Sequence, residues 1–517
     1  MNQKLFSFSS RSILRAVRFL VLAVAILSFM SGCARPEERE PKTVTVLEPA
    51  EIVKFTLDGQ LITTSKDRSI SPDGKYLLAA VQGKEADRVV AIPIDVPDPM
   101  SAAVSLYEAD KSWTRHNLVQ WVPIGWLSET ECVFAVHGWQ DQGPHKGERG
   151  TALYTGDISA GTTTLVSYLG VPEQGQLVDD AIFAGGDKVY IRIGWQFVEF
   201  DLESKSHRVI RDNLPAYYGL STVAVSPKGD QIVYATYGEE KSGLYVVDVA
   251  TGTERTLVET GESLSFYPSW SPDGKYIAMY TVYRVENSQA NGVYRYDFIP
   301  GEDGPFPSGQ EITVMTPDGT VLKRFTLEGQ YLSQLYWLDG GSGILFLSGP
   351  VTFGRWGEVI SAEYDSVWIA GLEDGEPLRI AGLEAIEEQM GEDIAYVFPV
   401  ASLPNGAGAL LNVAGAGNGS IWKVSPSAEP AKVADGWWDS ARLVPAYLDS
   451  VVGIIWQDGE SSLYLVGPEE TVRLGNASGN LSISAYTDRL LIASSYTFSE
   501  DKTEVTVFNM VTEKVLE

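Results

Sequence analysis

The stretch Ser71-Pro-Asp-Gly-Lys-Tyr76 recurs unchanged as Ser271-Pro-Asp-Gly-Lys-Tyr276, and Ser226-Pro-Lys-Gly-Asp-Gln231 is a close variant 45 residues before the second copy. An apolar run typical of a strand accompanies each copy: YLLAAV, YIAMYTV and IVYATY. In such a turn proline presets the first corner, aspartate bonds its local backbone, and glycine takes the left-handed position that closes the hairpin. A spacing of about 40–45 residues is that of one four-stranded blade, so the repeat predicts a β-propeller.

A second hairpin pattern recurs downstream of these turns. Apolar and polar residues alternate, a small or polar cluster follows, and the alternation resumes, which is typical of two antiparallel strands. We interpret these hairpins as the outer strand pairs of successive blades. The copies lie at 153–168, 197–210, 244–259, 312–325, 367–380, 421–434, 463–474 and 505–516, with a degenerate copy at 88–107. Inner strand pairs can be matched to them, for example at 440–456.

The fold class that follows is all-β. We expect a single β-propeller of about eight four-stranded blades, with seven to nine possible, over residues 43–517. The segment 43–57 is strand-like but has no blade of its own. We expect it to pair with the C-terminal strands and close the ring, because an open propeller leaves a long unpaired strand edge. The one helix that the pattern predicts is short, at 383–390.

The three turns, together with Trp270 just before the second full copy, resemble the TolB-type propeller repeat, a relative of the Trp-Asp repeats. The resemblance implies a propeller that acts through protein partners at the cell envelope. We expect no separate α/β domain before the blades, which would be a departure from that family. Similar blades occur in some serine peptidases, which need an α/β-hydrolase domain after the propeller. We expect none here, and no Gly-x-Ser-x-Gly elbow occurs in the sequence.

The N-terminal segment predicts export and lipidation. Basic residues precede the apolar run 19–30, which has the length of a signal-peptide core and is short for a membrane span. Ser31 and Gly32 then precede Cys33, so the segment resembles a bacterial lipoprotein signal ending in a lipobox. The resemblance implies removal of residues 1–32 and acylation of Cys33, for example with palmitate. The alternative is an ordinary secretory signal in which Cys33 is incidental.

Residues 33–42 are charged and proline-bearing, and we interpret them as a lipidated tether. We therefore expect an extracytoplasmic protein, anchored to the cell membrane through the lipid on Cys33. Ala34 argues against the aspartate signal that retains Gram-negative lipoproteins at the inner membrane. In a Gram-negative host the expected location is the outer membrane.

Charge and cysteine content narrow the function classes. The formal net charge is −29, which repels phosphate backbones and anionic headgroups and makes nucleic acid a poor partner. Apart from Cys33 there is one cysteine, Cys132, within an apolar strand-like run. An acylated Cys33 leaves Cys132 without a disulfide partner, and we expect a buried, unreactive thiol.

Two groups of residues are candidates for ligand binding. The first lies in one loop: His137, Trp139, Asp141 and His145. Two imidazoles and one carboxylate are zinc ligands, but the spacing is irregular and a plain polar loop is the alternative. The second consists of aromatic residues in two insertions: Tyr294, Tyr296, Phe306 and Trp356. Aromatic side chains on loops stack on sugars or anchor a protein partner, and alternatively bury their own loop.

The function that we expect is that of a non-catalytic lipoprotein that binds or scaffolds an envelope protein or a glycan, with no cofactor, no metal and no catalytic residue assigned. The alternative is a carbohydrate-active hydrolase or lyase that uses carboxylates in the propeller channel. That enzyme requires two or three close carboxylates, at least one partly desolvated. A sensor subunit beside a membrane partner is a third reading, which the sequence does not separate from the first.

Overall fold

The structure is a computed structural model of the 517-residue chain. It describes residues 44–47, 50–63, 68–111, 119–170, 178–183, 187–194, 196–211, 223–236, 242–260, 264–283, 311–327, 330–353, 359–362, 364–373, 375–403, 408–415, 419–443, 451–457, 460–466, 471–478, 480–487, 489–510 and 513–516. The chain divides into two compact units, one comprising residues 1–48 and 513–517 and the other residues 49–512. Among the described residues, no helix is long and apolar enough to cross a membrane.

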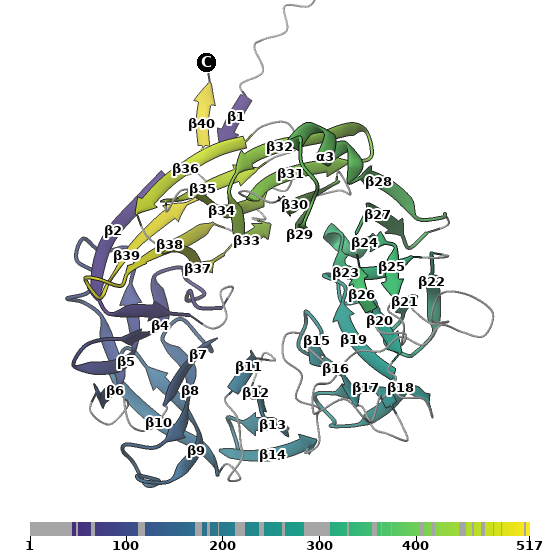
Figure 1. Ribbon diagram of the computed structural model, residues 1–517. Helices are drawn as coiled ribbons and strands as arrows, with labels where there is room; N and C mark the ends of the chain where they lie inside the picture. The colour runs from purple at the N-terminus through teal and green to yellow at the C-terminus, as the bar shows by residue number, and fades with distance from the viewer. Residues whose placement is uncertain are drawn as a thin grey trace, which may run out of the picture. The chain divides into compact units, whose positions relative to one another are not determined.

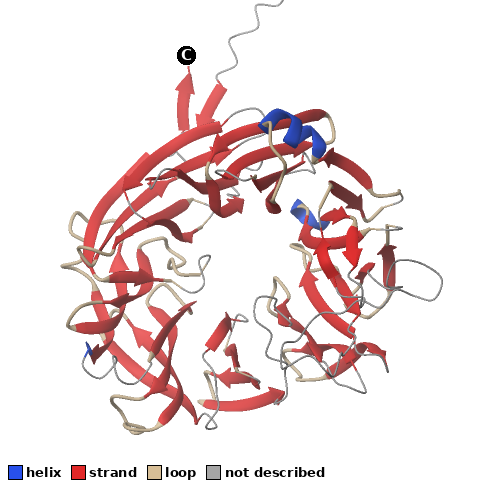
Figure 2. Ribbon diagram, in the orientation of Figure 1, coloured by secondary structure: helices blue, strands red, loops and turns tan. Residues whose placement is uncertain are grey.

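The larger unit is a β-propeller. Its described residues form nine four-stranded antiparallel sheets, the blades (Figure 1). Strands dominate Figure 2, where helix is confined to short segments. The all-β prediction is confirmed, and the nine blades lie at the upper end of the expected range.

The first three blades follow one another in the chain. Blade 1 consists of β3 (Gln60–Ile62), β4 (Tyr76–Gln82), β5 (Ala86–Pro93) and β6 (Val104–Asp110). Blade 2 consists of β7 (Gln120–Trp126), β8 (Glu131–Trp139), β9 (Arg149–Asp157) and β10 (Thr162–Gly170). Blade 3 consists of β11 (Val178–Phe183), β12 (Lys188–Ile193), β13 (Gln196–Asp201) and β14 (Ser206–Arg211).

The next three blades include the largest insertions. Blade 4 consists of β15 (Val223–Val225), β16 (Gln231–Thr236), β17 (Ser242–Asp248) and β18 (Glu254–Thr260). Blade 5 consists of β19 (Leu264–Trp270), β20 (Ile277–Tyr283), β21 (Glu311–Met315) and β22 (Val321–Phe325). Blade 6 consists of β23 (Tyr331–Trp337), β24 (Gly343–Gly349), β27 (Ser366–Gly371) and β28 (Leu378–Gly382), with the 3-10 helix η1 (Asp339–Gly341) and the hairpin β25 (Val351–Phe353) and β26 (Val359–Ala362) inserted.

The last blades contain both ends of the larger unit. The predicted short helix, α3 (Glu384–Met390), precedes blade 7, which consists of β29 (Tyr396–Leu403), β30 (Gly408–Ala414), β31 (Gly419–Ser425) and β32 (Ala428–Asp435). Blade 8 consists of β33 (Trp437–Leu443), β34 (Val451–Gln457), β35 (Glu460–Val466) and β36 (Thr471–Ser478). Blade 9 consists of β37 (Asn480–Tyr486), β38 (Leu490–Thr497), β39 (Lys502–Asn509) and β2 (Ala50–Asp58).

The N-terminal strand β2 supplies the fourth strand of blade 9. It pairs with β39 antiparallel from Ala50 opposite Asn509 to Asp58 opposite Lys502. This confirms the expected pairing of the chain ends. The interpretation of 505–516 as an outer hairpin is wrong, because the edge partner of β39 is β2. In the smaller unit, β40 (Glu513–Leu516) pairs instead with β1 (Val44–Leu47).

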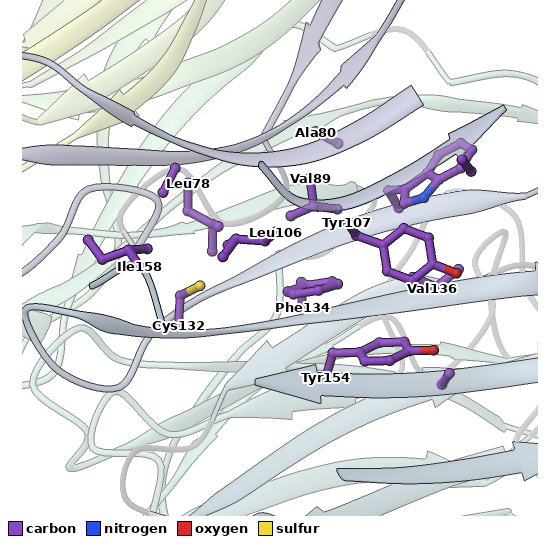
Figure 3. Packing of buried hydrophobic residues seen from close by; sticks show 14 of the residues in the cluster. Leu78, Ala80, Val89, Leu106, Tyr107, Cys132, Phe134, Val136, Tyr154 and Ile158 are labelled. Carbon is purple, nitrogen blue, oxygen red and sulfur yellow. The ribbon is translucent and has the colours of Figure 1, made fainter. Parts of the chain in front are cut away.

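Buried clusters join successive blades. In Figure 3, Leu78, Val89 and Leu106 of blade 1 lie with Phe134 and Tyr154 of blade 2 in one cluster. Corresponding clusters join each pair of neighbours from blade 2 to blade 8, and one packs Leu77 of blade 1 with Ile492 of blade 9. Blade 9 thereby contacts both blade 8 and blade 1, and the ring is closed. Burying one apolar side chain of this size contributes about 1.5–3 kcal/mol.

The serine turns fold as the sequence predicts, between the first and second strands of blades 1, 4 and 5. In blade 1, Ser71 Oγ donates to Asp73 Oδ1 at 2.7 Å and accepts the Tyr76 N–H at 2.9 Å. The same two bonds recur at Ser271. In the variant, Ser226 Oγ donates to Asp230 Oδ1 at 2.7 Å, so a carboxylate two positions later fills the same role. The turn glycines have φ of +71° to +76°, which few other residues adopt.

A tryptophan after each of these turns links neighbouring blades. Trp126, Trp270 and Trp337 each end the first strand of a blade. Each indole N–H donates to a backbone carbonyl of the preceding blade, two residues before its turn serine. The acceptors are Ser69, Ala224 and Ser269, at 3.0, 3.0 and 3.2 Å respectively. The bond ties the position of one blade to the turn of the blade before it.

Candidate functional site

The predicted polar loop after β8 is part of the blade 2 structure. His137 is the seventh residue of β8, is 1% exposed, and pairs through Nδ1 with Thr151 Oγ1 at 2.7 Å. Burial, followed by the nearby Arg149 charge, lowers the pKa of His137 to about 4. The imidazole is therefore neutral at neutral pH. It belongs to the interior of the blade rather than to a loop surface.

The rest of this loop folds onto blade 1. Asp141 Oδ1 accepts a hydrogen bond from the Tyr107 hydroxyl at 2.5 Å, and Gln142 Nε2 donates to the Glu108 carbonyl at 3.3 Å. Burial first, and then the Asp141 carboxylate, raises the pKa of Tyr107. Asp141 is thus held by a hydrogen bond to a residue of blade 1.

The two remaining residues of this group are His145 and Trp139. His145 stacks on Tyr168 with ring centroids 3.9 Å apart and pairs with Glu148 at 3.1 Å. Trp139 is 41% exposed. Across the part of the chain that the structure describes, no group of three His, Cys, Asp or Glu side chains is arranged to hold a metal ion.

Blade 2 also buries polar atoms that lack partners among the described residues. They are Gln120 Oε1, Trp121 Nε1, His137 Nε2 and Gln140 Oε1. Gln120 lies opposite His137 in the β7–β8 register. Such atoms cost free energy unless water or a ligand reaches them.

The other residues singled out from the sequence lie outside the described residues. They are Cys33, Tyr294, Tyr296, Phe306 and Trp356. Their predicted roles in lipidation and ligand binding stay predictions. Cys132 is described: it is buried, and burial raises the pKa of its thiol to about 12. The expectation of a buried thiol is confirmed for that residue.

The structure adds a pocket that the sequence did not indicate, which we call the turn pocket. It lies where the first turn of blade 9, the Ser71 turn of blade 1 and the end of β7 in blade 2 meet. Its volume is about 640 Å³, within the range of small-molecule sites. The lining residues are Arg68, Ile70, Ser71, Pro72, Asp73, Gly74, Trp126, Thr487, Arg489, Leu490 and Asn509.

The walls of the turn pocket are rigid for identifiable reasons. The Thr487 hydroxyl accepts the N–H groups of Arg489 and Leu490 at 3.2 and 3.0 Å, which fixes the blade 9 turn. The Trp126 indole is held by the interblade bond to Ser69. A Cβ on Gly74 would lie 3.3 Å from Leu490 Cδ1, so the turns of blades 9 and 1 touch.

Among the described residues, two arginines and one carboxylate line the turn pocket, and of these Arg68 and Asp73 already have interaction partners. Asp73 accepts hydrogen bonds from Ser71 Oγ and the Lys75 N–H, and pairs with Lys75 Nζ at 3.0 Å. Burial raises the pKa of Asp73, but its bonds with Ser71 and Lys75 outweigh burial and lower it. Arg489, on the blade 9 side of the pocket, is exposed.

Sequence reasoning missed these residues for a simple reason. The Ser71 turn was recognised only as a hairpin corner, and residues 68, 126 and 489 are far apart in the chain. One available signal was Trp126, which ends a first strand as Trp270 does.

Comparison with known proteins assigns no family. No protein-family model matches the chain, and no curated protein matches it. Among solved structures, oligogalacturonate lyase from Vibrio parahaemolyticus is similar at 11% identity and a TM-score of 0.37, over 90% of this chain and 98% of that one. The propeller domain of the Trilobed protease from Pyrococcus furiosus is similar at 14% identity and a TM-score of 0.36, over 67% and 97%.

Porphyromonas gingivalis dipeptidyl peptidase 4 is similar at 9% identity and a TM-score of 0.48, over 85% of this chain and 65% of that one. These likenesses bear on the propeller fold alone. The blade count rests on the sheet topology of the chain itself.

Proposed function

We propose that this protein is a non-catalytic binding module, a TolB-type propeller held at the outer side of a membrane by a lipid on Cys33. The observation that carries the binding role is the turn pocket, a cavity of about 640 Å³ with walls from three blades of a closed ring. The partner is an envelope protein or a glycan. Binding sites are built most accurately on rigid elements, and here hydrogen bonds within the turns and between blades hold the walls in place.

The chemistry of the pocket supports recognition rather than turnover. A hydrolase of the kind considered above needs a carboxylic acid whose pKa is raised by burial, beside a second carboxylate. Of the residues that the structure describes, Asp73 is the one carboxylate that lines the turn pocket; its pKa is lowered, and it is bonded to Ser71 and Lys75. The other described lining groups include the exposed Arg489 guanidinium and the Thr487 hydroxyl, which bind without exchanging protons at neutral pH.

The membrane anchor is the second part of the proposal. Support comes from the order of basic residues, a short apolar run and the small residues before Cys33. Metabolic labelling with palmitate tests this: wild type becomes labelled, and Cys33→Ser does not. Label on the Cys33→Ser variant would contradict the assignment.

The binding role is tested by capture from an envelope extract, with the full chain in detergent as bait. Arg489→Glu reverses one charge in the turn pocket, and Arg324→Glu reverses one exposed charge on β22 of blade 5 as a matched control. We expect a partner that wild type and Arg324→Glu retain and that Arg489→Glu loses. Equal retention by all three would contradict a role for the pocket, and turnover of a captured glycan would contradict the non-catalytic assignment.

A further inference from the structure

Lys323 joins blade 5 to blade 6 through its ammonium group. It lies on β22, the outermost strand of blade 5, opposite Val314 of β21 (Figure 1). Its Nζ donates to the carbonyl oxygens of Glu373 and Gly375 at 2.8 Å each, and to that of Gly371 at 3.4 Å. All three acceptors belong to blade 6, at the end of β27 and in the connection that leads to β28.

The connection offers these carbonyl groups because they lie outside the strand ladder of blade 6. The ladder between β27 and β28 ends at Ile369, which is opposite Leu378. Residues 371, 373 and 375 lie between this pair along the chain. A primary ammonium group has three N–H donors and a compact charge, and here it meets three acceptors.

A buried aromatic ring lies beside the same ammonium. Lys323 Nζ is 5.6 Å from the ring centroid of Phe325, within the range of a cation–π contact. Phe325 is 2% exposed and packs with Ile344 and Phe346 of blade 6. The ring and the carbonyl groups together therefore hold the ammonium at the junction of the two blades.

This arrangement differs from that of other described lysines, which pair with carboxylates. They are Lys54, Lys75, Lys111, Lys188, Lys275 and Lys432. A single carboxylate attracts any nearby cation, whereas three carbonyl oxygens around one nitrogen favour a group with several N–H donors. Backbone carbonyl oxygens that surround a monovalent cation can also replace its hydration shell.

We propose that the carbonyl oxygens of Gly371, Glu373 and Gly375 form a binding site for a primary ammonium group, and that Lys323 is its built-in ligand. The bound ammonium holds the β27–β28 connection in place and fastens blade 6 to blade 5. The site lies on other blades than the turn pocket, so this inference does not depend on the proposed function. When the Lys323 side chain is shortened, a free alkylammonium ion should bind in its place.

The test replaces the missing part of the side chain with a free ion. Lys323→Ala removes the equivalent of propylammonium, so propylammonium chloride is the probe. The readout is hydrogen exchange, measured by mass spectrometry on the full chain in detergent, of a peptide that contains the Leu372 amide. This amide lies in the connection and donates to the Ser342 carbonyl at 3.2 Å.

We expect exchange of the Leu372 amide to be at least about tenfold faster in Lys323→Ala, because hydrogen bonds from a charged group are lost. Propylammonium should restore slow exchange. Tetramethylammonium chloride has the same charge but no N–H donor, so it should not. Lys323→Gln keeps two donors without the charge, and its exchange should lie between those of wild type and Lys323→Ala.

Two controls separate the site from general effects. Lys54→Ala is matched, because Lys54 lies on the outer strand of blade 9 and pairs with the Glu504 carboxylate at 2.7 Å. Its Leu372 exchange should equal that of wild type. The Tyr76 amide of blade 1, bonded to Ser71 Oγ, reports that the propeller stays folded and should exchange equally in all samples.

The remaining outcomes would overturn the inference. Wild-type exchange in Lys323→Ala would mean that the carbonyl groups do not need the ammonium, and if that variant does not fold, Lys323→Gln decides the same point. Equal restoration by both ions would indicate an effect of charge alone. A lack of restoration by propylammonium would contradict a site for a primary ammonium group.

Discussion

The serine turns allow a sharp test, because blade 4 carries its carboxylate at a different position from blades 1 and 5. The perturbation is Asp230→Lys, which converts Ser-Pro-Lys-Gly-Asp to Ser-Pro-Lys-Gly-Lys. It removes the acceptor that lies 2.7 Å from Ser226 Oγ, while Ser226 Oγ itself accepts the Gln231 N–H at 3.0 Å. The double variant Lys228→Asp/Asp230→Lys recreates the Ser-Pro-Asp-Gly-Lys order of the other two turns.

The expected loss of free energy follows from the exposure of the Asp230 side chain. A hydrogen bond to a charged group contributes about 1.5–3 kcal/mol, and because the Asp230 side chain is exposed the lower value applies. A loss of about 1.5 kcal/mol makes the equilibrium constant for opening of the turn about tenfold larger. Lys228 is also exposed, so the exchange of the two residues meets no packed neighbour and should restore the bond.

The assay is hydrogen exchange measured by mass spectrometry on a peptide that contains the Gln231 amide. We expect about tenfold faster exchange in Asp230→Lys and near wild-type exchange in the double variant. Lys228→Asp alone keeps the Asp230 acceptor and serves as the control, with exchange within about twofold of wild type. Equal exchange in the single and double variants would refute the idea that a carboxylate at either position supports the serine.

Three further predictions concern other parts of the propeller. Trp270→Phe removes the interblade bond to Ala224, and urea denaturation should show a free energy of unfolding lower by about 1–2 kcal/mol; an unchanged value would mean that the bond contributes nothing. The pKa of His137 is about 4 in the native protein and 6.5 in the unfolded chain, so the unfolded chain binds the proton more tightly. The contribution of this residue to the free energy of unfolding is therefore complete above pH 6.5 and is lost as the pH falls towards 4. Wild type should therefore lose about 3 kcal/mol more than His137→Gln over that interval, and parallel pH profiles of unfolding would disprove it. The buried Cys132 thiol, with its pKa raised to about 12, should react with iodoacetamide only after denaturation; rapid alkylation of the native protein would contradict its burial.

The sequence by itself determined the blade and its turns. Proline, aspartate and glycine act on the backbone within a few residues, so Ser71, Ser226 and Ser271 could be placed in hairpins without knowledge of their neighbours. Strand alternation is also local, and it predicted the hairpins at 153–168, 244–259 and 421–434, which the structure confirms.

Only the tertiary structure decided what these hairpins form together. The number of blades depends on how sheets pack side by side, and nine rather than about eight resulted. The same packing made β2 the partner of β39 and so removed the hairpin expected at 505–516. The turn pocket depends on it too, because Arg68, Trp126 and Arg489 meet only when blade 9 closes against blade 1. Turn chemistry reaches a few residues along the chain, whereas Arg68 and Arg489 are more than four hundred positions apart, so no local pattern could place them in one pocket.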